Sequence, residues 1–260
     1  GVEVTFTSTL GTIVASAYTD TAGLAKARLL AGSTAGFSNV RATAGVANTS
    51  MLIEFHATNV GEVLLTVVPS RIVADGASSA NVTCFVLDTL GLPISDGTPV
   101  RFSGLSNGSV TPLFATTLAG EVSATINSFT TVGWDTLIAT SGDSTAEVAI
   151  EFLSGPPNYV DMWPADPILD ANETDTTRIY GVVYDEVGNP VNAGKIINFS
   201  VTPSDYGTIT PVTATDDTGA FSVRFRAGRY AGVAVISANC EGATGITQVD
   251  LMPTNVEDIG

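Results

Sequence analysis

One pattern of short apolar runs and turns occurs three times along this chain, at a nearly constant spacing. The copies end at matching runs, Ile53-Glu-Phe55, Ile150-Glu-Phe152 and Val249-Asp-Leu251. Phe55 and Phe152 are 97 residues apart, and Phe152 and Leu251 are 99 apart. A fixed period that recurs at several landmarks predicts an array of similar modules. We refer to the three copies as the first, second and third repeats.

Each repeat contains runs in which apolar and polar residues alternate, which is the pattern of a half-buried β-strand. A shift of one residue would turn the whole apolar set of such a strand toward solvent, so its register is strongly specified. The intervening positions, including Ser222 and Arg224, are polar and are expected to face water. The aligned apolar sets are Ala25, Ala27 and Leu29; Val122, Ala124 and Ile126; and Phe221, Val223 and Phe225.

Turn signals separate these runs, and no segment has sustained helical periodicity. Gly91-Leu-Pro93 and Gly188-Asn-Pro190 combine a residue that tolerates positive φ with one that fixes φ, which is typical of tight turns. In the stretch from Thr215 to Gly219, an aspartate can accept hydrogen bonds from its own backbone. About seven short strands per repeat, separated by such turns, predict a two-sheet β-sandwich.

These residues resemble the bacterial immunoglobulin-like repeats of the intimin and invasin type. The second repeat carries the pattern at Ala74-Asp75-Gly76, Asp88, Gly91, Pro93, Val100, Phe102, Gly108, Val110, Thr116, Gly120, Leu137 and Ala139. The third carries it at Asp185, Gly188, Pro190, Phe199, Gly207, Ile209, Thr215, Asp216, Gly219, Ile236 and Ala238. Thr117 stands where the pattern has aspartate, and Asp170-Ala-Asn172 replaces the opening Asp-Gly pair. The resemblance implies an all-β fold of tandem immunoglobulin-like β-sandwich domains, without the lectin-like tip of those adhesins.

Alignment of the repeats predicts the domain limits. Residues 63–153 and 159–252 are expected to form immunoglobulin-like domains, followed by a tail or linker at 253–260. Residues 1–56 correspond to a domain truncated at its N-terminus, without its first two strands, so Val4 and Phe6 would lie uncovered. Each large apolar side chain left in water costs about 1.5–3 kcal/mol. Either a longer array supplies the two strands, or a neighbouring subunit donates them in trans.

Charge argues against some classes of partner. Ten basic residues against 26 acidic ones give a net charge of −16, which would repel nucleic acid and an anionic membrane surface. No apolar stretch approaches the roughly 18 residues that a transmembrane helix needs. We expect an extracellular or cell-surface protein, bacterial by the resemblance, with an archaeal or virion surface as alternatives.

Two features typical of enzymes are incomplete. Gly104-Leu-Ser106-Asn-Gly108 matches the G-x-S-x-G string of a nucleophile elbow, but an elbow needs a following helix and a histidine partner. The single histidine, His56, lies in the first repeat, with no second histidine or cysteine nearby in the sequence for a zinc site. We therefore expect no catalytic residue, no cofactor-binding residue and no enzymatic activity.

The acidic stretch from Asp170 to Asp175 alternates oxygen-bearing side chains, as calcium loops do. It lacks the central glycine and the distal glutamate of an EF-hand, so a solvated acidic loop is the simpler interpretation. Asp161, Asp166 and Asp170 remain calcium candidates, in a clamp that would stiffen the array. No other metal or cofactor is expected.

The two cysteines fall in different repeats, so neither sandwich can hold an internal disulfide. Cys84 alternates with Val82 and Val86, which predicts a small buried apolar residue. The pattern leaves the redox state of Cys84 and Cys240 open.

The two tryptophans are candidates for a sugar-stacking platform, but they are solitary. Trp134 aligns with Phe37 and Val233, which predicts a core or edge position. Trp163 precedes Pro164 and is predicted to pack at the junction between repeats. Both are therefore interpreted as structural.

The predicted function is structural: a rod-like spacer, stalk or filament shaft in a surface adhesin or fibre. Linkers containing Pro156 and Pro157 would limit bending between domains. The expected partners are neighbouring immunoglobulin-like domains of the same or an adjacent chain. One alternative is a homopolymer, a filament subunit completed by strand donation. The alternative from a different class is a glycan- or host-protein-binding module.

Overall fold

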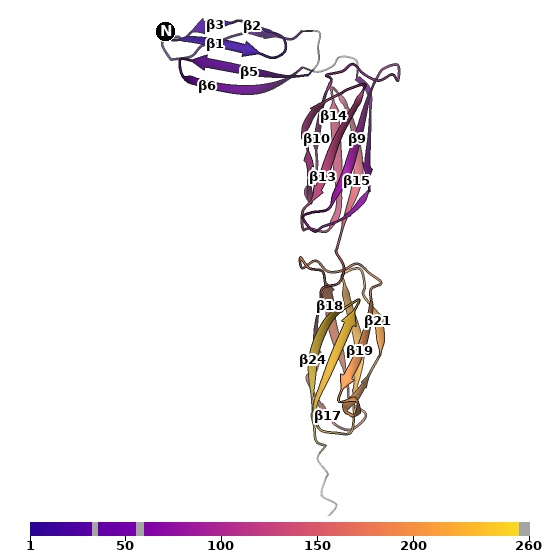
Figure 1. Cartoon of the computed structure of the whole chain (residues 1–260). Coiled ribbons are helices and arrows are strands. Elements are labelled where there is room, and N and C mark those ends of the chain that lie inside the picture. Colours follow the sequence, from indigo (N-terminus) through magenta and orange to yellow (C-terminus); the bar gives the residue numbers. More distant parts are fainter. Residues whose placement is uncertain (33–35, 56–59, 255–260) are drawn as a thin grey trace, which may run out of the picture. The chain divides into compact units, whose positions relative to one another are not determined.

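The structure, a computed structural model, describes residues 1–32, 36–55 and 60–254 (Figure 1). Apart from one 3-10 turn, η1 (Ser204–Tyr206), every regular element among these residues is a β-strand, which confirms the all-β fold. The chain divides into two compact units. One holds Gly1–Ile72, Ala77–Ser128 and Trp134–Glu151, and the other holds Val73–Gly76, Phe129–Gly133 and Phe152–Gly260.

The second repeat consists of two sheets. One has the strand order β11-β13-β9-β7 and the other the order β12-β10-β14-β15-β8. Each sheet turns an apolar face inward, and Val100, Leu137 and Ile150 have no exposed surface. The strands are β7 (Val60–Val68), β8 (Arg71–Val73), β9 (Ser79–Asp88), β10 (Pro99–Ser103), β11 (Gly108–Thr111), β12 (Phe114–Thr116), β13 (Glu121–Ser128), β14 (Gly133–Ser141) and β15 (Ser144–Leu153).

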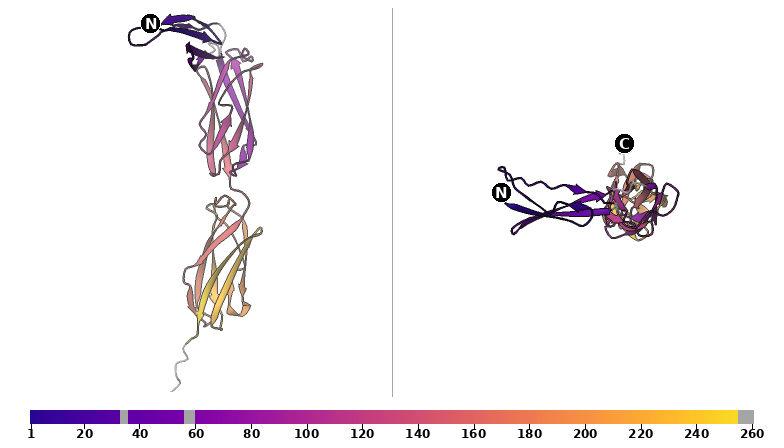
Figure 2. Two further views of the ribbon diagram at one scale, coloured as in Figure 1. Left: turned by 60° about the vertical axis from the view of Figure 1, so that its left-hand side comes forward. Right: turned by 90° about the horizontal axis from the view of Figure 1, so that it is seen from above.

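The third repeat repeats this arrangement strand for strand. Its strands form two layers (Figure 2), one with the order β20-β22-β18-β16 and the other with the order β24-β23-β19-β21. One residue pair joins β16 to β24 in parallel. A single apolar cluster fills the space between the layers, with Ile179, Phe225 and Ile236 fully buried. The strands are β16 (Tyr159–Pro164), β17 (Ile168–Asp170), β18 (Thr176–Tyr184), β19 (Ile196–Thr202), β20 (Gly207–Ile209), β21 (Val212–Ala214), β22 (Ala220–Ala227), β23 (Gly232–Cys240) and β24 (Ala243–Met252).

The described residues of the first repeat form six strands: β1 (Glu3–Ser8), β2 (Thr12–Ile13), β3 (Ser16–Tyr18), β4 (Leu29–Leu30), β5 (Gly36–Ala44) and β6 (Ala47–Phe55). They correspond in order to β10–β15 of the second repeat. One sheet has the order β3-β1-β5-β6, and β2 pairs with β4 alone. No described strand of this repeat corresponds to β7, β8 or β9.

The strand predicted over Ala25, Ala27 and Leu29 is mostly absent. Only Leu29–Leu30 is paired, with β2. The equivalent strand β13 has a second neighbour, because it also pairs with β9 from Glu121 to Asn127. Among the described residues, the run before Leu29 has a partner strand only on its β2 side, where the Arg28 carbonyl oxygen accepts from the Val14 amide at 3.4 Å, and the strand shortens.

The turns between strands are held by aspartates that cap their own backbone, as the sequence predicts. The Oδ1 atom of Asp88 accepts hydrogen bonds from the amides of Leu90 and Leu92, at 2.8 and 2.9 Å. Asp185 makes the equivalent pair with Val187 and Asn189. The side chains therefore close these turns without help from another strand.

The position of Thr117 corrects the sequence alignment. Its hydroxyl donates to the Ser95 carbonyl at 2.8 Å and accepts from the Thr98 amide at 3.1 Å, and the residue is buried. Thr215 makes the same two kinds of contact in the third repeat. Thr117 is thus the counterpart of Thr215 and does not replace an aspartate. The turn that follows it is one residue shorter than in the third repeat.

One core site is filled differently in the two sandwiches. In the second repeat, Cys84 lies opposite Val122 across β9 and β13. In the third repeat, the equivalent pair is Gly181 opposite Phe221, so a larger ring occupies the space that a smaller residue leaves. A Cβ atom at Gly181 would overlap the Phe221 ring and the carbonyl oxygen of Asp161. The two sequences therefore reach similar packing by opposite distributions of volume.

We predict that Gly181→Ala lowers the free energy of unfolding by about 1–3 kcal/mol, because the added methyl overpacks the core. Urea unfolding of the full chain, followed by a probe of the third repeat, measures the loss. Adding Phe221→Val to the same chain should recover part of it. Additive losses in the double variant would contradict the packing argument.

Candidate functional site

The serine string lies in a turn between two strands. Ser106 and Asn107 donate their backbone amides to Oδ2 of Asp135, at 2.6 and 2.7 Å, which folds the chain from β10 into β11. A nucleophile elbow requires a helix after the serine, whereas here the chain continues as a strand at Gly108. The other candidate for enzyme or zinc chemistry, His56, lies outside the described residues.

The calcium candidates lie on three different elements. Asp161 is an exposed residue of β16, Asp166 belongs to the loop after it, and Asp170 ends β17. In the acidic loop, Asp175 accepts from the Asp170 amide at 3.2 Å and from the Asn172 side-chain amide at 2.7 Å. Among the described residues, no group of three or more histidine, cysteine or acidic side chains is arranged to hold a metal ion.

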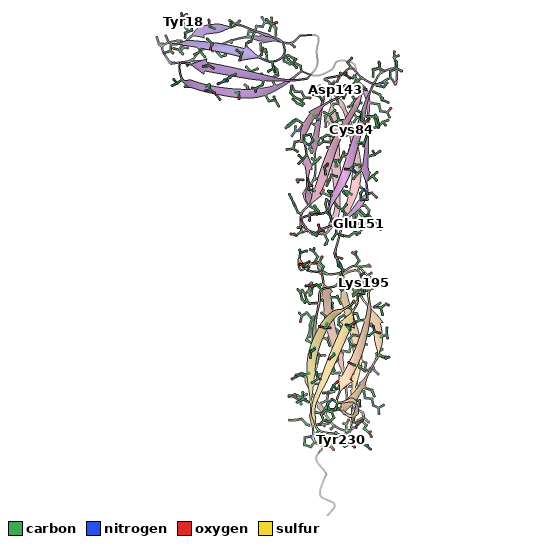
Figure 3. All side chains as sticks on the ribbon, in the orientation of Figure 1. Tyr18, Cys84, Asp143, Glu151, Lys195 and Tyr230 are labelled. Carbon is green, nitrogen blue, oxygen red and sulfur yellow. The ribbon has the colours of Figure 1, made fainter. Side chains whose placement is uncertain are left out.

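Both cysteines are buried free thiols, Cys84 in the second repeat (Figure 3) and Cys240 in the third. Burial of Cys84 raises the pKa of its thiol to about 12, because the apolar core disfavours the thiolate. The pKa of the Cys240 thiol is also raised, first by burial and then by the nearby charge of Glu241. A thiol that stays protonated is a poor nucleophile and metal ligand, so Cys84 is a core residue, as its alternation with valines predicts.

Both tryptophans lie on strands and are exposed, which excludes the core but not the edge among the positions predicted for Trp134. Trp134 is 63% exposed at the start of β14, so it is not a core residue. Trp163 is 46% exposed on β16, in register with Tyr180 of β18. It faces outward because it alternates with Val160 and Met162, which occupy the core.

A hollow of about 410 Å³ lies at the end of the third repeat where Tyr230 is found (Figure 3). Its lining includes two cations, Arg226 and Arg229, and two carboxylates, Glu173 and Asp205. Arg226 already donates to the carbonyl oxygen of Glu173, and Arg229 lies over the ring of Tyr230. The two positive and two negative charges of the lining cancel, so the hollow has no net charge that would attract a charged ligand.

The inner face of the first repeat is open. Val4, Phe6 and Ile53 point to the side where the other two repeats have their core, yet each is only half-buried. Their counterparts Val100, Phe102 and Ile150 are at most 1% exposed. The difference follows from topology, because the second repeat covers those residues with the sheet that contains β7 and β9. Among the described residues, this apolar face of the first repeat is only partly covered.

The outer face of β16, β18 and β22 is the second unusual surface, and its make-up was missed by the sequence analysis. Alternation correctly predicts that Ser222 and Arg224 face water. It does not say which residues of other strands stand beside them. The cross-strand register places Arg224 opposite Arg178, and Trp163 opposite Tyr180.

Comparison with solved structures identifies the architecture. The chain is similar to invasin, a bacterial integrin-binding protein, with a TM-score of 0.59 and 22% identity over 97% of this chain and 53% of that one. It is also similar to FdeC, an Escherichia coli adhesin, with a TM-score of 0.51 and 17% identity over 96% of this chain and 85% of that one. The fold is that of tandem immunoglobulin-like domains.

At these identities the similarity is one of fold. The chain spans about half the length of the invasin structure. No family model matches the sequence, and no curated protein matches it. The described part of the chain contains no helix of the length and apolar character that crossing a membrane requires.

For calcium, we predict that addition of the ion leaves the unfolding temperature unchanged and produces no binding heat. The reason is that Asp170, Asn172 and Asp175 already satisfy one another and neighbouring amides. Calorimetric titration of the full chain tests this, with magnesium as the control ion. A calcium-specific rise in unfolding temperature that Asp170→Asn removes would restore the calcium clamp.

Proposed function

We propose that this chain is a structural segment of a bacterial surface adhesin, in which tandem immunoglobulin-like domains act as a spacer at the cell surface. The observation that supports the proposal is the strand-for-strand recurrence of one sandwich in the second and third repeats, each with its own fully buried core. A module that closes its own core can be added in tandem to extend the chain. The similarity in fold to invasin and FdeC is consistent with this use.

The linker before the third repeat supports a mechanical role. Gly155 donates its amide to Oδ2 of the buried Asp185 at 2.9 Å, and Ser154 accepts from the Asn192 amide at 3.1 Å. Pro156 and Pro157 follow directly and restrict the backbone. The entry of the chain into the third repeat is thereby fixed by hydrogen bonds, as a module under tension requires.

We predict that stretching the full chain in a force spectrometer gives two main unfolding events of similar length. Each repeat of about 90 residues should release roughly 300 Å of chain, at about 3.3–3.6 Å per residue. Asp185→Ala should lower the unfolding force of one event, while Asp216→Ala, which removes another turn aspartate of the same repeat that accepts from Thr218 and Ala220, serves as the matched control. A single event spanning the whole chain would contradict independent modules.

The open face of the first repeat favours a second function: it receives a pair of strands from a neighbouring segment of the same kind. The second repeat illustrates the geometry of such a pair, in which β9 pairs with β13 and β7 pairs with β9. Three residues of β9, Val82, Cys84 and Val86, supply the apolar side chains that the core requires. A donor with this alternation would bury Val4, Phe6 and Ile53 of the first repeat.

Fusion of residues 60–96, which include the connection from β9 toward β10, ahead of residue 1 tests whether the face accepts strands. We predict that the fusion slows amide exchange at residues 25–30, since a donor strand gives this run a sheet partner, and raises the unfolding temperature of the first repeat. A control fusion with Val82 and Val86 replaced by serine should do neither, because its strand offers no apolar face. Equal effects of both fusions would argue against strand uptake.

The source of the strands is a separate question. Sedimentation of the unfused chain across a wide concentration range distinguishes donation in trans, which gives polymers, from completion within one chain. An SDS-resistant ladder that disappears when residues 253–260 are deleted would identify the tail as the donor. Such a tail can supply one strand at most, at ~3.3 Å per residue.

A further inference from the structure

The outer face of β16, β18 and β22 in the third repeat gathers aromatic and cationic side chains. Tyr180 is flanked across the sheet by Trp163 on one side and Ser222 on the other. The next outward row of β18 and β22 holds Arg178 opposite Arg224. All five residues are exposed to solvent. They form one continuous surface, which we call the aromatic–arginine face.

Two rows of this face lie within the span of one or two sugar units. Side chains two residues apart on a strand are roughly 7 Å apart, which is the separation of Tyr180 from Arg178. Directly opposite residues have Cβ atoms about 4.5–5.5 Å apart, which applies to Arg178 and Arg224. The register therefore places Arg178 and Arg224 side by side, in the row next to Trp163 and Tyr180.

The arginines of this face lack carboxylate partners. Arg178 donates to the Ser222 hydroxyl at 3.2 Å, and Arg226, one row further, donates to a backbone carbonyl. The ion pairs found among the described residues, Arg71 with Glu151 and Lys195 with Glu241, lie elsewhere. Like charges directly opposite each other destabilise a sheet. An anion between Arg178 and Arg224 would remove this repulsion.

The fold itself does not require these residues, because the second repeat builds the same face from small neutral ones. In the same register, Thr66 lies opposite Thr83, and Asn81 lies opposite Thr125. These positions correspond to Trp163, Tyr180, Arg178 and Arg224 of the third repeat. Strand pairing is the same in the second and third repeats, but only the third carries the aromatic–arginine face.

We propose that the aromatic–arginine face binds a linear polysaccharide that carries carboxylates, with uronic acid units as the recognised chemistry. The rings of Trp163 and Tyr180 offer flat apolar surfaces to the faces of sugar rings. The guanidinium groups of Arg178 and Arg224 match the geometry of a carboxylate and donate paired hydrogen bonds to it. The hydroxyl of Ser222 adds a polar group suited to sugar hydroxyls.

Size favours a polysaccharide over an acidic protein as the occupant. A stable protein interface engages about 20–30 residues on each side and buries about 800 Å² per partner. The aromatic–arginine face has five principal side chains, and Asp161, on the same outer face of β16, restricts its extent. The chain as a whole is acidic, but screening at physiological salt limits that repulsion to about 8 Å, so the local arginines dominate.

Fluorescence of Trp163 provides a direct test on the full chain. Trp134→Phe leaves Trp163 as the only tryptophan, and Trp134 is exposed enough for the change to be tolerated. The probe is an oligogalacturonate, and its fully methyl-esterified form is the neutral counterpart. We expect the carboxylate form to change the Trp163 emission at physiological salt, the neutral form to bind at least about tenfold more weakly, and further salt to weaken the first more than the second.

Variants copy the residues of the second repeat so that the fold is preserved. Arg178→Asn with Arg224→Thr should weaken oligogalacturonate binding at least about tenfold and leave the unfolding temperature unchanged or higher, because the opposed charges are gone. Tyr180→Thr should weaken both the charged and the neutral probe. The matched control, Lys26→Thr with Arg28→Thr, removes the same charge from the first repeat and should change neither.

Three results would overturn the proposal. The first is no binding of oligogalacturonate to the full chain at physiological salt. The second is an equal loss in the Lys26 and Arg28 control, which would indicate non-specific attraction to net charge. The third is binding of polyglutamate as tight as that of oligogalacturonate and independent of Tyr180, which would assign the face to an acidic protein.

Discussion

The whole structure depends on the burial of one apolar face of each sheet against another. Each strand carries an apolar side and a polar side, so a single sheet leaves half of its side chains in an unfavourable environment. In the second and third repeats, two sheets meet and remove residues such as Ile150 and Ile236 from water. This burial depends on strands whose apolar residues alternate with polar ones, on aspartate turns that connect the strands, and on core residues whose sizes fit one another.

The first repeat illustrates the same constraint by its incompleteness. Its strands have the sequence and register of their counterparts, yet Phe6 and Ile53 are only half-buried, because among the described residues the facing layer consists only of the short pair β2 and β4. The shortening of β4 to Leu29–Leu30 has the same origin, since a strand without a second neighbour leaves its backbone groups unpaired. Local sequence is therefore sufficient to start a strand, but a facing layer is needed to complete it.

The outer faces are free of this constraint, and there the repeats diverge. The core must be filled, and the pair Cys84 and Val122 fills in the second repeat the site that Gly181 and Phe221 fill in the third. The solvent side requires only polarity, and the second repeat meets that need with threonine and asparagine. The third repeat places Trp163, Tyr180 and a pair of arginines there, at a cost in charge repulsion that packing does not explain. The proposed binding of an acidic polysaccharide accounts for the residues of the aromatic–arginine face.

The sequence alone determined the all-β fold, the three repeats, the aspartate turns and the burial of Cys84, because periodicity and turn chemistry are local. It placed Thr117 one position out of alignment, since only the contacts to Ser95 and Thr98 reveal its role. It also gave no indication that Trp163 lies opposite Tyr180 on an outer strand face. Tertiary structure decided which side chains become neighbours: strand pairing brings Arg178 beside Arg224 from 46 positions away, and no alternation within one strand encodes that register.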